Sequence, residues 1–357
     1  MRWVPAVLLI DGDMGEGGGQ ILRTALSLSL CLRRPFRIVH IRQRRHKPGL
    51  QPQHLAAVRA AAAIGRAELE GAELHSTELL FAPRGIVAGE YRFDIGTAGS
   101  TTLVLQTVIL PLLMAATASQ LTLIGGTHNP LAPSFEFMQQ AFLPLLARMG
   151  AKVELELLRP GYYPVGAGEV RARIHPCDRL TPLFLEQRGK IIGIRALATL
   201  SRLPEHIARR ELRVVAEGLG LEDSALSLEL EQRAGCAGNT LQVTVESEQV
   251  TDLFTAIGRR GLPAESVAKQ VVNQVKRYLA ADVPVGSYLA DQLLLPMALS
   301  GGGAFVTLAP DRHTPTNIEV IRRFLSLAIE SRVLAADRWR IEIAGTTGEV
   351  CENDGGK

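Results

Sequence analysis

A glycine-rich stretch near the start of the chain combines charged residues in a way that suits phosphate chemistry. It runs from Asp11 to Arg23 in the order Asp-Gly-Asp-Met-Gly-Glu-Gly-Gly-Gly-Gln-Ile-Leu-Arg. Apolar residues before and after it predict a strand, a tight loop and a helix. Glycine lets backbone N–H groups approach a ligand closely, and a helix N-terminus favours an anion. The stretch is therefore a candidate phosphate site, with a simple packing turn as the alternative.

Two side chains in this stretch favour chemistry over packing. Glu16 lies inside the loop, where a carboxylate repels phosphate unless a cation bridges the two. Arg23 lies one turn into the predicted helix and is placed to reach the same anion. No Gly-Lys-Ser/Thr sequence follows, so the loop is not a Walker loop, nor is it the dinucleotide fingerprint in its usual setting.

A basic run without acidic residues follows between residues 33 and 47. Its cationic residues are Arg33, Arg34, Arg37, Arg42, Arg44, Arg45 and Lys47. Such runs are usually solvated surface, but arginine forks also bind phosphate oxygens in pairs. Alternation along a predicted strand would place Arg42 and Arg44 on opposite faces. We expect this run to contact a polyphosphate or the phosphates of RNA.

His313 is the histidine with the most informative surroundings. Thr314 can cap a helix that has Pro315 at its first position. Alternatively, Thr316 and Glu319 form a capping box. Either arrangement puts His313 just before a helix N-terminus, where a phosphoryl group is stabilised. A neutral imidazole there can attack phosphorus, although a single histidine is more often structural.

Two further segments are candidates for ligand contacts. The Gly/Ser/Thr-rich loop at residues 94–102 opens a helix and is either an anion cradle or a helix cap. Tyr288 lies at a loop edge in a chain with few aromatic residues, close to Asp291 and Gln292. A base can stack on such a tyrosine, whereas core packing is its ordinary role.

The elements that carry these residues recur three times. Each copy has a glutamine in an apolar helix, a short strand, a loop with histidine and proline, and a second helix. The glutamines are 86 and 186 residues apart and the histidines 82 and 185, so about one hundred extra residues separate the second and third copies. The marker residues are Gln20, Gln106 and Gln292, with His46, His128 and His313. Such periodicity indicates duplicated supersecondary units.

The predicted fold is therefore α/β (α+β). A large domain of three repeated βα-type units occupies residues 1–185 and 284–357, and a small α+β domain is inserted at 186–283. In the large domain we expect strands at 36–41, 121–124 and 305–308 and second helices at 53–64, 134–149 and 317–329. In the insert we expect strands at 190–200, 226–230 and 241–245 and helices at 205–218 and 267–278. No motif in the insert assigns it a role.

Bulk composition narrows the class of protein. The 357 residues are 46% hydrophobic and 21% charged, and the net charge of +3 leaves any nucleic-acid contact to a local patch. Four cysteines lie far apart without a Cys-x-x-Cys pair, which favours a reducing compartment over a zinc ribbon or disulfide framework. The N-terminus does not read as a signal peptide, and the apolar run at 103–116 is too short to span a bilayer. We expect a soluble cytoplasmic protein.

These motifs together resemble those of the RNA 3′-terminal phosphate cyclases, over nearly the whole chain. The segments that carry the resemblance are 11–23, Lys47-Pro48-Gly49-Leu50 with Gln53-His54-Leu55, Gly99-Ser100 to Gln106, 286–292 and 313–317. The resemblance implies three repeated α/β units plus a smaller inserted domain. This fold is shared with enolpyruvyl transferases, and it agrees with the spacings above.

The resemblance also implies an activity of the ligase class. ATP converts an RNA 3′-phosphate to a 2′,3′-cyclic phosphate through a covalent histidine–AMP adduct and an RNA adenylate, releasing pyrophosphate and AMP. His313 matches the nucleophile. Glu16 matches a contact to Mg²⁺ or Mn²⁺, and Pro133 and Tyr288 would sandwich the adenine. The matching ATP-site residues are Arg23, Arg42, Arg45, Gln106, Pro133, Tyr288, Leu289, Ala290, Asp291 and Gln292.

The chain departs from the family pattern at Gln51, where arginine is common, and at His46, which extends the basic loop. Both concern contacts to the RNA end, which we expect to be phosphate-driven and tolerant of sequence.

A non-catalytic relative in ribosome assembly is one alternative function, but such relatives lack the nucleophilic histidine. An enolpyruvyl-type transferase is a second alternative, which would not need His313 or the segment from Tyr288 to Gln292.

Overall fold

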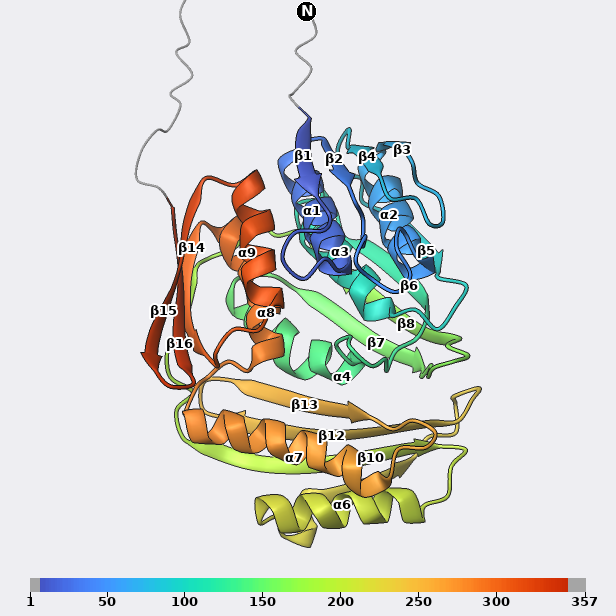
Figure 1. Cartoon of the computed structure of the whole chain (residues 1–357), viewed down its shortest axis with the longest axis vertical. Helices are drawn as coiled ribbons and strands as arrows, with labels where there is room; N and C mark the ends of the chain where they lie inside the picture. The colour runs from blue at the N-terminus through green and yellow to red at the C-terminus, as the bar shows by residue number, and fades with distance from the viewer. Residues whose placement is uncertain (1–6, 346–357) are drawn as a thin grey trace, which may run out of the picture.

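The computed structural model describes residues 7–345, and its first unit sets the pattern for the rest (Figure 1). The unit comprises β1 (Leu8–Asp11), α1 (Gly19–Leu32), β2 (Phe36–Val39), α2 (Pro52–Gly65), β3 (Glu68–Glu70) and β4 (Leu79–Ala82). The sheet order is β1-β2-β4-β3, in which β1 and β2 are parallel and the other pairs are antiparallel.

The second and third units repeat this order and these strand directions. The second contains β5 (Glu90–Asp94), α3 (Thr101–Leu113), β6 (Ser119–Gly125), α4 (Phe135–Phe137), the π-helix η1 (Met138–Phe142), α5 (Leu143–Arg148), β7 (Val153–Arg159) and β8 (Gly168–Ile174). The third contains β9 (Leu183–Leu185), α8 (Ser287–Ser300), β14 (Gly302–Thr307), α9 (His313–Phe324), β15 (Leu327–Ala335) and β16 (Arg338–Gly345). Their sheets run β5-β6-β8-β7 and β9-β14-β16-β15, so the predicted threefold repeat is confirmed.

A fourth sheet lies between β9 and α8 in the sequence. Its elements are β10 (Ile191–Ser201), α6 (His206–Leu219), the 3₁₀ turn η2 (Asp223–Ala225), β11 (Leu226–Leu230), β12 (Gly238–Ser247), β13 (Thr251–Ile257) and α7 (Ala264–Ala281). The order is β11-β10-β12-β13, and α6 and α7 pack on the face away from the three units (Figure 1). We call these elements the insert; the limits 186 and 283 stay a prediction.

The helices of the three units share one core. Helices α1, α3 and α8 are apolar around most of their circumference, as expected for helices surrounded by protein. Helix α1 packs against α3 and α9, and α8 packs against α9. The sheets cover this helical centre from outside, so helices from different units lie side by side in the interior.

Several sequence predictions need correction. Gln20 is the second residue of α1, whereas Gln106 and Gln292 are each the sixth residue of their helix, so Gln20 is not their equivalent. The helix starts at 19, 101 and 287 give spacings of 82 and 186, which agree better with the histidine spacings. The helix predicted to reach Ile329 ends at Phe324, because the chain turns there into β15.

The antiparallel half of each unit was not predicted, because β3, β4, β7 and β8 are short or carry charged residues on an exposed face. The helix expected at 134–149 exists but is wound as α4, η1 and α5.

Predictions for residues 1–6 and 346–357, including the N-terminal segment, the outer ends of the large domain and Cys351, lie outside the described residues. Within residues 7–345, no helix has the length and apolar character needed to cross a membrane.

Candidate active site

The glycine loop lies against the start of α9, although nearly three hundred residues separate the two in sequence. Gly15 has φ +54°, and a Cβ there would lie 2.1 Å from the Thr316 hydroxyl, so only glycine fits. The backbone N–H of Glu16 donates to that hydroxyl at 3.0 Å, and the hydroxyl donates to the Arg312 carbonyl at 2.7 Å. The first and third units are thus joined at the candidate site.

His313 is the first residue of α9, not the residue before its cap. Arg312 occupies the N-cap position, so neither capping arrangement predicted for Thr314 or Thr316 is formed. The Asp311 carboxylate accepts the His313 backbone N–H at 2.8 Å. The Thr314 hydroxyl instead donates to Asp291 Oδ1 at 2.6 Å. A side chain from a neighbouring helix therefore engages the threonine that the sequence suggests as a local cap.

The His313 ring is held through one nitrogen. Nδ1 lies 3.0 Å from Gln20 Oε1 and 3.5 Å from Glu16 Oε1. Within the described chain, Nε2 has no hydrogen-bond partner, and the side chain is about half exposed. When Nδ1–H donates to Gln20, the neutral tautomer has its lone pair on Nε2, which is then free to act as a nucleophile.

Glu16 links this histidine to the arginines. Its side chain is only 7% exposed, and Oε2 pairs with the Arg45 guanidinium. Burial opposes ionisation of Glu16, but the hydrogen bond to His313 and the charges of His313, Arg45 and Arg23 outweigh it and lower the pKa of the carboxyl. The same hydrogen bond raises the pKa of His313. Both shifts favour a carboxylate beside a ring that can carry positive charge.

The three arginines predicted for the ATP site surround this loop. Arg45 also donates to the backbone carbonyls of Glu16 (2.9 Å) and Gly17 (3.3 Å). Arg42 donates to two carbonyls of its own loop, at 2.6 and 3.2 Å. Burial lowers the pKa of Arg23 to about 10, which still leaves it cationic at neutral pH. Positive charge is thus concentrated next to Glu16, the carboxylate that also contacts His313.

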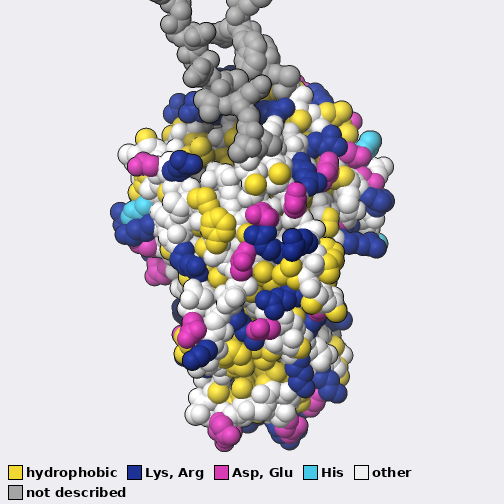
Figure 2. All heavy atoms as spheres, turned by 90° about the vertical axis from the view of Figure 1, so that its left-hand side faces the viewer, with side chains coloured by type: hydrophobic (Ala, Val, Ile, Leu, Met, Phe, Trp, Pro, Cys, Tyr) yellow, Lys and Arg dark blue, Asp and Glu magenta, His cyan; other side chains and the backbone are white. Residues whose placement is uncertain are grey.

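The rest of the basic run behaves differently. Strand β2 ends at Val39 and Arg42 has φ +55°, so Arg42 and Arg44 lie in a turned loop and do not alternate along a strand. Arg44 pairs with Asp13 at 2.8 Å, and Arg37 pairs with two glutamates of the first unit. On the face where β15 and β16 lie, basic, acidic and apolar side chains are intermixed (Figure 2). No continuous basic band crosses the described part of that face.

The start of α8 supplies another side of the site. Tyr288 is 53% exposed and available for stacking, whereas Leu289 and Ala290 are buried in the shared core. Any nucleotide contact by Leu289 or Ala290 would therefore use backbone atoms. Burial raises the pKa of Asp291 to about 7. The Asn317 amide donates to the Asp291 carbonyl at 3.2 Å, which fixes α8 to α9.

The second unit joins through Gln106 and the loop before α4. The Gln106 amide donates to the Gln292 side chain, so two of the repeated glutamines meet directly. The Pro133 carbonyl accepts the Thr102 hydroxyl at 2.7 Å. Within the Gly/Ser/Thr-rich loop, Ser100 caps α3 by accepting the Leu103 N–H, which supports the cap interpretation of that loop.

Two residues of the site were not predicted as such. Gln20 was predicted only as a repeat marker, yet it orients His313; its place directly after the glycine loop was the available signal. His54 lies beneath the loop, since a Cβ on Gly19 would be 2.4 Å from its Nε2. Burial, helped by the charges of Arg42 and Arg23, lowers the pKa of His54 to about 3, so its ring stays neutral.

Comparison with known proteins agrees with this geometry. The family model for RNA 3′-terminal phosphate cyclase matches residues 14–331. An RNA 3′-terminal phosphate cyclase of Pseudomonas fluorescens is 49% identical over 92% of this chain and 95% of its own length. One from Koribacter versatilis is 45% identical over 91% of each chain. A solved enolpyruvyl transferase, NikO from Streptomyces tendae, covers 94% of this chain and 49% of its own, at 11% identity and a TM-score of 0.34, too low to support an argument. The chain belongs to the RNA 3′-terminal phosphate cyclase family.

Proposed function

We propose that the chain uses ATP to convert an RNA 3′-phosphate to a 2′,3′-cyclic phosphate through a covalent adduct on His313. The observation that carries the proposal is the holding of His313 Nδ1 by Gln20 and Glu16 next to a cluster of arginines. This arrangement leaves Nε2 as the attacking atom. It also puts a carboxylate where positive charge grows on the ring during attack.

The steps of the proposed reaction are those that the resemblance to the family implies. Nε2 of His313 bonds to the α-phosphorus of ATP while the bond to pyrophosphate breaks. An oxygen of the RNA 3′-phosphate then bonds to that phosphorus, and the bond to His313 breaks. The neighbouring 2′-hydroxyl attacks the RNA phosphorus, loses its proton and releases AMP. Arg23, Arg42 and Arg45 would bind the phosphate oxygens and stabilise the charge of the leaving pyrophosphate.

The nucleoside would lie across the start of α8. Tyr288 is exposed there and would stack on one face of the adenine, with Pro133 on the other. Asp291, Gln292 and Gln106 form the polar edge of this region and would fix the orientation of the nucleotide. Leu289 and Ala290 would support it from the core.

The carboxylates of this site fit a divalent cation that the protein would share with the substrate phosphates. Within residues 7–345 no cluster of three histidine, cysteine or acidic side chains is arranged to hold a metal by itself. Glu16 offers one carboxylate, and in the same loop Asp13 Oδ1 is buried without a partner among the described residues. One or two carboxylates plus substrate phosphates are the usual ligands of Mg²⁺. When bound, Mg²⁺ or Mn²⁺ would neutralise charge on the phosphates.

The test is adduct formation with labelled ATP and a divalent metal. The native chain is expected to acquire one covalent AMP, which His313→Ala abolishes, whereas His46→Ala, at an exposed histidine of the basic loop, retains it. An RNA with a 3′-phosphate should discharge the adduct and become cyclic, and one with a 3′-hydroxyl should not. Absence of any adduct on the native chain would refute the proposal.

A further inference from the structure

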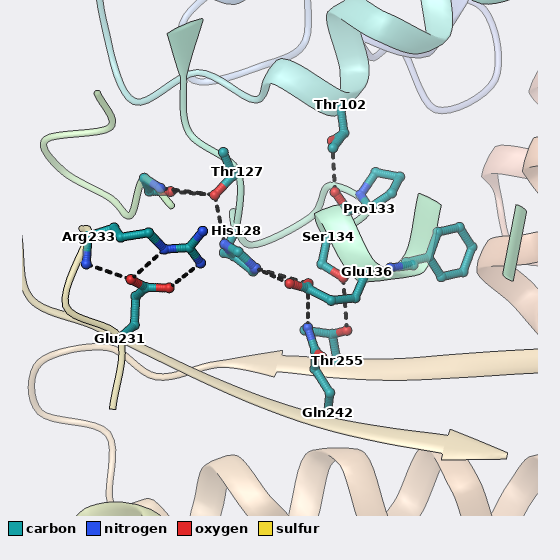
Figure 3. A network of polar contacts seen from close by, with 12 residues as sticks. Thr102, Thr127, His128, Pro133, Ser134, Glu136, Glu231, Arg233, Gln242 and Thr255 are labelled. Carbon is teal, nitrogen blue, oxygen red and sulfur yellow. Dashed lines mark hydrogen bonds and ion pairs between the residues drawn. The ribbon is translucent and has the colours of Figure 1, made fainter. Parts of the chain in front are cut away.

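The insert holds the loop that carries Pro133. Gln242 of β12 and Thr255 of β13 are directly opposite one another in the sheet. Both reach α4 of the second unit: Gln242 Nε2 donates to Glu136 Oε2 at 2.6 Å, and the Thr255 and Ser134 hydroxyls lie 3.4 Å apart (Figure 3). Ser134 follows Pro133 directly and caps α4 by accepting the Phe137 N–H. The backbone beside Pro133 is therefore tied to the insert.

This contact is reinforced from the other side. His128 Nε2 lies 2.9 Å from Glu136 Oε2, and its ring stacks on Tyr162 with centroids 5.2 Å apart. Burial opposes ionisation of Glu136, but His128 outweighs it and lowers the pKa of the carboxyl to about 2. Glu136 is thus a permanent acceptor for Gln242, and the polar contacts of this partly buried cluster make its geometry specific (Figure 3).

The same strand also holds the start of α8. Asp252 is 2% exposed and lies three residues before Thr255 on β13. Its carboxylate accepts the Gly286 N–H at 2.7 Å and the Leu253 N–H at 2.8 Å. The Tyr278 hydroxyl of α7 donates to the Pro284 carbonyl at 3.0 Å, so two bonds from the insert fix the segment that enters α8. Tyr288 follows Gly286 by two residues.

We propose that β13 of the insert sets the separation of the two walls that hold the adenine, Pro133 and Tyr288, and so determines how tightly the base is bound. The inference rests on the proposed function, in which these two residues sandwich the adenine. Asp252 and Thr255 are about 10 Å apart along one strand. A rigid sheet with contacts at both points keeps the two walls in fixed register, and Asp252, Gln242 and Thr255 act as positioning residues.

The spacing matters because stacking depends steeply on distance. A gap of 0.5–1 Å beyond contact loses roughly a quarter to a half of the dispersion attraction. Stacking of one base commonly accounts for on the order of tenfold or more in affinity. Releasing one wall is therefore expected to weaken nucleotide binding about two- to threefold, which is a quarter to a half of a tenfold effect on the free-energy scale. The phosphate contacts come from α1 and the basic loop and should not change.

The experiment measures binding to the full chain by calorimetry. The ligands are α,β-methylene ATP, α,β-methylene GTP and tripolyphosphate; none of them can transfer AMP, and tripolyphosphate lacks a base. The variants are Asp252→Asn, which loosens the Tyr288 wall, and Gln242→Leu, which loosens the Pro133 wall. Matched controls are Asp282→Asn and Gln249→Leu, both at exposed positions of the insert.

We expect each variant to lose about two- to threefold in affinity for the ATP analogue and a similar factor for the GTP analogue, because adenine and guanine rings are equally thick, with tripolyphosphate affinity unchanged. The controls should match the native chain. Equal losses for all three ligands, or an unchanged affinity for both nucleotide analogues, would overturn the inference. If either variant fails to fold, Thr255→Val, which removes only the hydroxyl contact to Ser134, is measured with the same ligands and the same expected outcomes.

Failure of the two proposals is distinguishable. A native chain that binds the ATP analogue but forms no AMP adduct refutes the proposed function and leaves the wall contacts testable by binding. A native chain that forms the adduct, with variants that keep the native affinity for both nucleotide analogues, refutes the role of β13 alone.

Discussion

A buried carboxylate in the insert allows a stability prediction of defined sign. Glu211 of α6 is fully buried, and its Oε1 accepts the Asn239 amide at 2.6 Å. Its Oε2 and Asn239 Oδ1 are both buried without a partner among the described residues. Burial raises the pKa of Glu211 to about 7. In Glu211→Gln the new amide can donate to Asn239 Oδ1 while its oxygen keeps the existing bond, so both orphaned atoms gain a role.

The magnitude follows from linkage. A rise from 4.5 to about 7 corresponds to roughly 3 kcal/mol of stability, at 1.36 kcal/mol per pKa unit. Because the folded pKa of this acid is raised, its contribution is fully present below the unfolded pKa and is lost as the pH rises through about 7. Glutamine has no charge to bury. We therefore expect Glu211→Gln to be about 3 kcal/mol more stable than the native chain at pH 8, and to differ from it by less than about 1 kcal/mol at pH 5.

Urea unfolding at both pH values, followed by circular dichroism, measures this difference. Glu217→Gln is the matched control, since Glu217 is an exposed residue of the same helix and should change stability by less than about 0.5 kcal/mol at either pH. A Glu211→Gln protein that is less stable than the native chain at pH 8 would contradict the reasoning. So would a stabilisation of equal size at both pH values, because that would not arise from an ionisation.

Two glycines separate effects on catalysis from effects on folding. A Cβ on Gly18 would lie 2.0 Å from Glu16 Oε1, which is the end of a flexible side chain. We therefore expect Gly18→Ala to displace the carboxylate and to slow AMP transfer about 10- to 100-fold, with little change in melting temperature. A normal rate of AMP transfer would mean that the position of Glu16 is unimportant. A Cβ on Gly238 would lie 2.2 Å from the buried Tyr162 ring, so Gly238→Ala should destabilise the fold by about 1–3 kcal/mol in urea unfolding. Gly193→Ala, where a Cβ meets nothing within 4 Å, is the control for Gly238, and an equal loss in both would exclude the clash as the cause.

The repeat, the presence of an insert and most residues of the candidate site could be predicted from the sequence. The spacings between repeated residues reveal the repeat because each unit must build the same strand, helix and loop. This held even though Gln20 was matched to the wrong position in its helix. Glycine and arginine patterns near Glu16 indicated a phosphate loop because close backbone approach and bidentate anion binding need those residue types. The family motifs, not periodicity, were needed to propose His313 as the nucleophile.

How these residues meet could be learned only from the packed chain. The partner of Glu16 is Thr316, and that of His313 is Gln20, each from a unit nearly three hundred residues away, and local pattern carries no information on such pairs. The start of α9 was wrongly predicted for the same reason, since Thr314 bonds to Asp291 of another helix and not to its own first turn. The sequence of the insert shows no motif for its contacts to α4 and α8, because each contact is a single polar bond. The residues that make these bonds are common in exposed strands, and only packing reveals that they are buried.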